Sequence, residues 1–313
     1  MRTEALDGYL EPARTTGGIW RPVLGMLITL GVYVLGMIVV VLGWVLLRWA
    51  MLGDVDQALE STGGLATTGS RAGVAITLLS FIGIWFGLWI AQVAMHRQSF
   101  WTLFDPARRI RWGDIGRGVL VALLFSGVSL SIAAVIIGLP EQSQAVSGWA
   151  ILLVPLMFCV FLQATAEELI FRGYLLQQLG SRFRSVLVWA VLPSILFGLM
   201  HAWNAEGAAA YYYMAITGIT GLTLALLVWR TGNLWAAVGM HWAVNVLSLT
   251  GVGAEGILSG TQLWLFPKEA LMPLLQIDLV VSVVLLALVA APTGRLLGDE
   301  RVPRGSVGEK VIE

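Results

Sequence analysis

The stretch VLGMLITLGVYVLGMIVVVLGWVLL, residues 23–47, contains no charged side chain. A helix of about 20 apolar residues spans a bilayer, because only a backbone that satisfies its own hydrogen bonds is stable in hydrocarbon. The stretch therefore predicts a membrane-spanning helix. The whole chain has the same character: 58% of its 313 residues are hydrophobic and 12% are charged, which is about half the charged share of soluble domains.

Uncharged runs of this kind divide most of the chain into spans. We expect clear spans at residues 23–47, 72–95, 118–139, 186–203, 207–229 and 234–252. Two further spans carry polar residues: 149–179 contains Glu167, Glu168 and Arg172, and 275–291 contains Asp278, for which we expect a capping or interfacial role. The sequence thus predicts an all-α, polytopic membrane protein with about eight transmembrane helices.

Charge and cysteine content argue against several other classes of protein. The 19 basic and 19 acidic residues cancel, which removes the case for a nucleic-acid-binding protein built on bulk charge. Cys159 is the single cysteine, so a disulfide framework and a cysteine-based metal site are both excluded. Lys268 and Lys310 are the only lysines, and this arginine bias is typical of a bacterial genome rich in G and C.

The chain divides into three regions. Residues 1–22 mix charged and apolar side chains and lack the short apolar segment and cleavage site of a signal peptide, so we expect a cytoplasmic N-terminal segment. Residues 23–292 form the membrane domain. Residues 293–313 are polar and contain Gly and Pro, and we expect a loose cytoplasmic tail.

The distribution of basic residues predicts the orientation. Most arginines fall at the two ends of the chain and in the loops on one side of the predicted spans, whereas Arg48, Arg71 and Lys268 fall on the other side. Basic residues near span ends accumulate on the cytoplasmic side. We therefore expect an integral protein of the bacterial cytoplasmic membrane with both termini in the cytoplasm.

Three ionisable side chains lie close together in the span at 149–179. Glu168 and Arg172 are four residues apart and share a helix face, which favours an ion pair. Glu167 points about 100° away, without a partner of its own in this segment, and a carboxylate in an apolar cavity suits a general base. A structural polar cluster is the alternative. For Glu168 and Arg172 a structural role and a functional role are equally favoured. For Glu167 a functional role is favoured.

Two of the three histidines also lie in spans. His201 is near the end of its span, and His241 lies four residues before Asn245, on the same helix face. A lone histidine in an apolar helix is usually a core residue. Polar side chains from three spans must instead hydrogen-bond to one another, because lipid offers them no partner. We expect one site, to which Gln163, one turn before Glu167, could hydrogen-bond, with the base, proton carrier and neutral donors that hydrolysis needs.

Three motifs in this order resemble a known family of intramembrane proteases, the CAAX-protease and bacteriocin-processing (CPBP, or Abi) family, which includes the type II CAAX prenyl (Ras-converting) endopeptidase. The motifs are Glu167-Glu168-x-x-x-Arg172, Phe197-x-x-x-His201 and His241-x-x-x-Asn245. The resemblance covers residues 152–249. It implies an integral membrane endopeptidase whose site opens to the cytosol and whose substrate is a peptide or lipidated protein at the membrane.

The resemblance also implies a role for each of the six site residues: water activation by Glu167 and His201, oxyanion stabilisation by His241 and Asn245, and support of Glu168 by Arg172. An asparagine amide fits its role because it is a neutral, preorganised donor.

The cofactor requirement has two readings. Glu167, His201 and His241 could form a three-ligand zinc site with an open position. However, the chain has no H-E-x-x-H motif on one helix. We favour a mechanism without a cofactor, with zinc as the alternative.

The two histidines differ in expected depth. At about 1.5 Å per residue, His201 lies roughly 12 Å further into the membrane than His241. They meet only if the span at 186–203 begins below the membrane surface or is tilted. We expect the helices on either side of the polar residues 180–185 to project into the cytosol as a hairpin.

Two other functions remain possible from the sequence. A transporter or channel would use buried carboxylates and histidines as a proton or cation relay, but no internal repeat supports it. The second alternative is a non-catalytic member of the same fold that acts as an immunity factor or scaffold.

Overall fold

The computed structural model describes residues 3–63, 70–256 and 259–291. In this part of the chain, seven helices are long and apolar enough to cross a membrane, which confirms the all-α polytopic fold. They cover Trp20–Leu52, Arg71–His96, Trp112–Ile136, Val146–Arg182, Leu187–Asn204, Ala208–Thr231 and Lys268–Ala290. The expected tail at 293–313 lies outside the described residues.

The span expected at 234–252 is a shorter helix than these seven. Helix α11 (Trp235–Val246) continues into the π-helical segment η7 (Leu247–Gly251), and a strand follows. Most side chains of α11 are buried, and the helix packs against α6, α7 and α10. Because protein surrounds it, α11 does not need to match the thickness of the bilayer.

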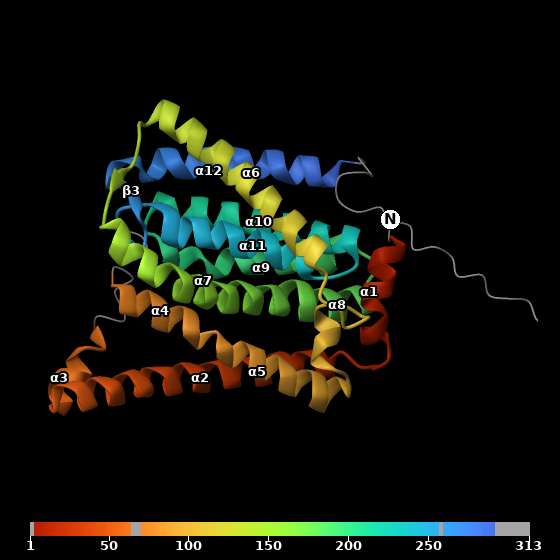
Figure 1. Ribbon diagram of the computed structural model, residues 1–313. Coiled ribbons are helices and arrows are strands. Elements are labelled where there is room, and N and C mark those ends of the chain that lie inside the picture. The colour runs from red at the N-terminus through yellow and green to blue at the C-terminus, as the bar shows by residue number, and fades with distance from the viewer. Residues whose placement is uncertain (1–2, 64–69, 257–258, 292–313) are drawn as a thin grey trace, which may run out of the picture.

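Most of the long helices run roughly side by side in layers, whereas α6 (Trp112–Ile136) crosses them obliquely (Figure 1). One outer layer holds α2 (Trp20–Leu52), α3 (Val55–Glu60), α4 (Arg71–Ser80) and α5 (Ile82–Ala91). The middle layer holds α7 (Val146–Glu168), α9 (Leu192–Met200), α10 (Ala208–Thr231) and α11. The other outer layer holds α6 and α12 (Leu271–Ala290).

Short helical segments complete the chain. The π-helical segments are η2 (Gln92–His96), η4 (Leu169–Leu175) and η5 (Leu187–Val191), and the 3-10 turns are η3 (Phe100–Leu103), η6 (Ala202–Asn204) and η8 (Lys268–Ala270). Helix α1 (Glu4–Arg14) lies across one end of the bundle (Figure 1).

Helix α7 continues through η4 into α8 (Leu176–Arg182), which gives one helical run from Val146 to Arg182. At about 1.5 Å per residue the run is roughly 55 Å long, well beyond the ~30 Å of bilayer hydrocarbon. This length supports the expected projection of the α8 end into the cytosol, which stays a prediction.

A small sheet, which the sequence analysis did not predict, lies at the end of the bundle opposite α1 (Figure 1). Its strand order is β1 (Glu141–Gln142), β3 (Trp264–Phe266), β2 (Val252–Ala254), with β1 antiparallel and β2 parallel to β3. Strands of two or three residues are too short to show an alternating pattern. The sheet ties together the loops that lead into α7 and α12 and out of α11.

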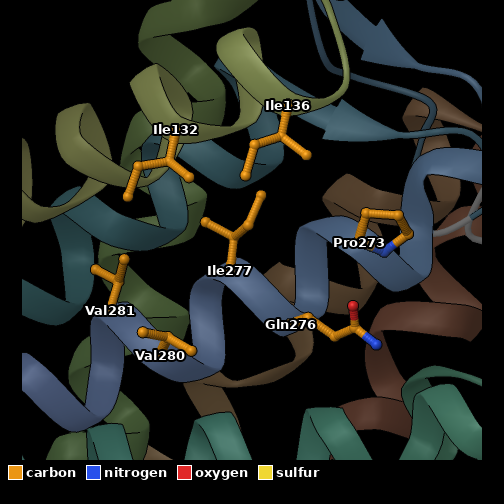
Figure 2. A pocket seen from close by; sticks show the side chains of 7 residues that line it. All are labelled: Ile132, Ile136, Pro273, Gln276, Ile277, Val280 and Val281. Atoms are coloured by element: carbon orange, nitrogen blue, oxygen red, sulfur yellow. The ribbon is translucent and has the colours of Figure 1, made fainter.

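Helices α6 and α12 line a hollow of about 320 Å³ (Figure 2). Its lining is almost entirely apolar: Ile132, Ile136, Pro273, Gln276, Ile277, Val280 and Val281. Next to it, Asp278 accepts a hydrogen bond from the Ser129 hydroxyl. Asp278 lies inside α12 and makes no helix cap, so the capping role expected for it is wrong. Its carboxylate instead links α12 to α6.

Close helix packing positions α11. A Cβ added at Gly118 of α6 would lie 2.1 Å from the Ala236 carbonyl oxygen, and one added at Gly239 would lie 2.3 Å from the Ile115 carbonyl oxygen. Glycine at both positions lets the two backbones approach, as is common between membrane helices.

We expect Gly118→Ala to lower the free energy of unfolding by about 1–3 kcal/mol, because a methyl group there overlaps the α11 backbone. The matched control is Gly127→Ala on the same helix, where nothing lies within 4 Å of an added Cβ. Thermal unfolding in detergent measures both variants. Equal melting temperatures for the two would contradict the packing described here.

Candidate active site

The two glutamates are the last residues of α7, where the helix widens into the π-helical segment η4. Single π turns inside α-helices often occur at functional sites. Arg172 lies in η4, and its Nη1 donates to Oε1 of Glu168 at 2.8 Å. Both side chains are essentially unexposed, at 1% and 0%. The ion pair expected from their spacing is therefore present and fully buried.

The guanidinium of Arg172 is enclosed on several sides. Its Nε donates to the Gly221 carbonyl oxygen at 3.3 Å, and its Cζ lies 4.4 Å from the centroid of the Phe197 ring. A Cβ on Gly221 would lie 2.5 Å from Nη2 of Arg172. The absence of a side chain at Gly221 thus makes room for the arginine.

The same Glu168 oxygen also orients His241. Nδ1 of His241 donates to Oε1 of Glu168 at 2.8 Å. In the neutral ring the other nitrogen, Nε2, then carries a lone pair. Nε2 lies 3.2 Å from Nδ2 of Asn245 and 3.5 Å from Oε2 of Glu167. Glu168 thus fixes the imidazole so that its free nitrogen faces Glu167.

Glu167 has the fewest hydrogen bonds of the side chains in this cluster. Its side chain is 12% exposed. Among the described residues, its Oε2 is buried and has no hydrogen-bond partner. A carboxylate oxygen that faces an imidazole, with no donor fixed to it, is free to accept a proton from a third group.

Gln163 belongs to the same cluster, although it was not one of the six expected site residues. Its Oε1 accepts a hydrogen bond from Nδ2 of Asn245 at 3.0 Å, and Gln163 is buried. Its position one turn before Glu167 was the sequence signal for this contact. Nδ2 of Asn245 is therefore shared between Gln163 and His241.

His201 stands apart from this cluster. It follows the last residue of α9, its Nδ1 donates to the Phe197 carbonyl oxygen at 2.7 Å, and it is partly exposed. The Phe197 ring packs against both imidazoles, with centroid distances of 4.7 Å to His201 and 5.9 Å to His241. Within the described chain, His201 makes no hydrogen bond or ion pair with either glutamate.

The proposed zinc ligands are only partly assembled. Glu167 and His241 face each other, whereas His201 lies beyond Phe197. Residues 3–63, 70–256 and 259–291 contain no group of three His, Cys, Asp or Glu side chains placed to hold a metal ion. The arrangement does not fit a three-ligand zinc site, and no step proposed below is assigned to a metal.

This part of the chain is similar to a known protein family. Residues 147–247 match the family model described as "Type II CAAX prenyl endopeptidase Rce1-like". The matched residues are about a third of the chain. The chain is also similar to the "Uncharacterized protein YyaK" of Bacillus subtilis (strain 168), with 24% identity over 248 residues, 77% of this chain and 80% of YyaK. No solved structure gives a significant match.

The region that matches this family model contains all six expected site residues, from Glu167 to Asn245. It starts in α7 and ends in η7. Helices α1 to α6 and α12 lie outside it. The resemblance read from the three motifs is thus confirmed for this region, whereas the roles of the individual residues stay predictions.

We expect Arg172→Met to lower the free energy of unfolding by about 3–5 kcal/mol, because it leaves the buried Glu168 charge uncompensated. Arg117→Met is the control, since the Arg117–Asp114 pair at 3.0 Å is partly exposed and such pairs contribute about 0–1 kcal/mol. Thermal unfolding of the purified protein gives both values. An Arg172→Met protein as stable as Arg117→Met would contradict the buried ion pair.

Proposed function

We propose that the protein is an intramembrane endopeptidase that hydrolyses a peptide bond in a membrane-associated or lipidated substrate. One observation carries the proposal: the buried Oε2 of Glu167, which accepts no hydrogen bond from the described residues, faces Nε2 of His241 at 3.5 Å. The match of residues 147–247 to the CAAX prenyl endopeptidase family supports it.

Glu167 acts as the general base in this proposal. It takes a proton from a water molecule, whose oxygen then attacks the carbonyl carbon of the peptide bond and forms a tetrahedral oxyanion. The proton passes to the leaving amine when the C–N bond breaks. Glu168, held by Arg172, keeps His241 oriented throughout.

Asn245 and His241 stabilise the oxyanion together. In the resting site Nδ2 of Asn245 lies against Nε2 of His241, so this amide hydrogen is not yet available to substrate. Glu167 passes the proton that it took from water to Nε2 of His241, 3.5 Å from its Oε2, which removes the acceptor and frees the amide hydrogen. Both groups then become donors when negative charge develops, which is the condition for transition-state stabilisation.

His201 receives a different role from the other five residues. It is more exposed than the glutamate cluster, and the Phe197 ring separates it from His241. We assign to it the last transfer of this same proton, from the glutamate cluster to the leaving amine, after its ring turns away from the Phe197 carbonyl oxygen.

The proposal places the protein in the bacterial cytoplasmic membrane with both termini in the cytoplasm. Seven helices of the described residues are long and apolar enough to span a membrane, which makes it an integral membrane protein. Helix α11 adds an eighth pass through the bundle, and the basic loops of the sequence support this orientation. The substrate then reaches the site from the cytosolic face, as a peptide that carries a lipid anchor or lies in the membrane.

We expect Glu167→Gln to abolish peptide cleavage and to leave folding intact, because the amide keeps the shape of the side chain and loses its basicity. Glu206→Gln, an exposed position in the loop after His201, is the control and keeps full activity. Cleavage of a fluorogenic peptide by the purified protein in lipid measures both. A fully active Glu167→Gln enzyme would end the proposal.

A panel of prenylated and unprenylated C-terminal peptides identifies the substrate class. We expect cleavage to persist with a chelator, because Glu167, His201 and His241 do not come together as a zinc site. Activity that is lost with chelator and restored by zinc would overturn the metal-free mechanism. Proton-coupled flux in liposomes without cleavage would instead support a transporter.

A further inference from the structure

Helix α1 precedes the first membrane-spanning helix and packs against α8 and α10. It lies across the end of the bundle at which α8 finishes (Figure 1). Its side chains Leu6, Tyr9 and Leu10 are completely buried. The N-terminal segment is therefore part of the folded core, although the Rce1-like match begins at residue 147.

Tyr9 connects α1 to the segment that carries Arg172. Its hydroxyl donates to the Leu103 carbonyl oxygen at 2.5 Å and lies 3.2 Å from the Arg172 carbonyl oxygen. A phenol has one proton, so the two carbonyls share it. Burial raises the pKa of Tyr9 well above its usual value, and the charges of Glu168 and Asp105 raise the pKa further. The phenol therefore stays a donor at neutral pH.

A second link reaches the same π-helical segment. The Thr16 hydroxyl lies 3.1 Å from Nδ1 of His96, and Nε2 of His96 lies 2.8 Å from the Tyr174 hydroxyl. His96 and Tyr174 are both buried. Residues 9–16 thus contact η4 at Arg172 directly and at Tyr174 through His96.

The position of the Arg172 backbone controls the site. Its guanidinium is confined between the Phe197 ring and the Gly221 backbone. A shift of the Arg172 main chain therefore moves Nη1 relative to Glu168, and Glu168 in turn orients His241. A π turn departs from the regular hydrogen-bond pattern of an α-helix. Contacts from outside the helix therefore contribute more to its stability.

We propose that Tyr9 is a positioning residue for the active site: it holds the Arg172 carbonyl and so keeps the guanidinium against Glu168. The inference rests on the peptidase function proposed above. It assigns α1 the task of stabilising the catalytic geometry from outside the matched region.

Tyr9→Phe tests the inference, because it removes the hydroxyl and keeps the buried ring. We expect kcat to fall by roughly tenfold with KM unchanged, since displacement of a catalytic group by about 1 Å costs up to a hundredfold. Thr3→Val is the matched control: the Thr3 hydroxyl donates to the Trp229 carbonyl oxygen at 2.8 Å and accepts from the Leu6 amide at 3.1 Å as the N-cap of α1. The change therefore loosens α1 without removing a contact to η4. This variant keeps the wild-type kcat.

Hydrogen exchange of the amides at 169–176 gives a readout independent of activity. We expect faster exchange there in Tyr9→Phe and wild-type exchange in Thr3→Val.

If Tyr9→Phe does not fold, Tyr174→Phe removes the second link and must show the same local increase. Wild-type exchange at 169–176 in the Tyr9 or Tyr174 variant, or equal losses of kcat in Tyr9→Phe and Thr3→Val, would overturn the inference. If the wild-type protein cleaves no peptide, only the proposed function is contradicted. The exchange experiment then still tests the role of Tyr9.

Discussion

A single carboxylate oxygen, Oε1 of Glu168, accepts hydrogen bonds from both Arg172 and His241, and the arrangement of the site depends on it. An unpaired charge buried to this extent would destabilise the fold strongly. Arg172 supplies the opposite charge, and His241 is oriented by the same oxygen. The second imidazole nitrogen then points to Glu167 and Asn245. One buried ion pair thus determines where the reactive groups lie.

This interaction needs close backbone packing around it. Gly221 makes room for the Arg172 guanidinium, and Gly118 and Gly239 let α6 approach α11, the helix that carries His241. In lipid, such small residues allow the close van der Waals packing that holds helices together. Side chains at Gly118 or Gly239 would overlap the backbone of the neighbouring helix and shift α11, which carries His241, whereas one at Gly221 would overlap the Arg172 guanidinium.

The parts of the site that follow from local helix periodicity were predictable. The Glu168–Arg172 pair and the shared face of His241 and Asn245 both come from a spacing of four residues. The contact between Glu168 and His241 was not, because it depends on how α7 and α11 pack. For His201 the helix rise already indicated a difference in depth from His241, but its contact with the Phe197 ring depends on how α9 packs.

The fold shows the same division between local pattern and packing. The long apolar runs predicted the membrane-spanning helices, whereas the strands of two or three residues carry no recognisable pattern. For α1 a signal existed: Leu6, Tyr9, Leu10 and Ala13 follow the spacing of an amphipathic helix, and all four are buried. The charged residues of 1–22 indicate a cytoplasmic location. They do not indicate that α1 packs against η4.

Nitrogen-15 NMR of histidine-labelled protein in lipid bilayers tests the central interaction most directly. The chain has only three histidines, so single substitutions of His96 and His201 leave His241 assigned. We expect a proton at Nδ1 of His241, with a strong hydrogen bond from this nitrogen to Glu168 that disappears in a Glu168→Leu variant. A ring protonated only at Nε2, or an Nδ1 signal that the Glu168 variant does not change, would contradict the shared carboxylate and the site built on it.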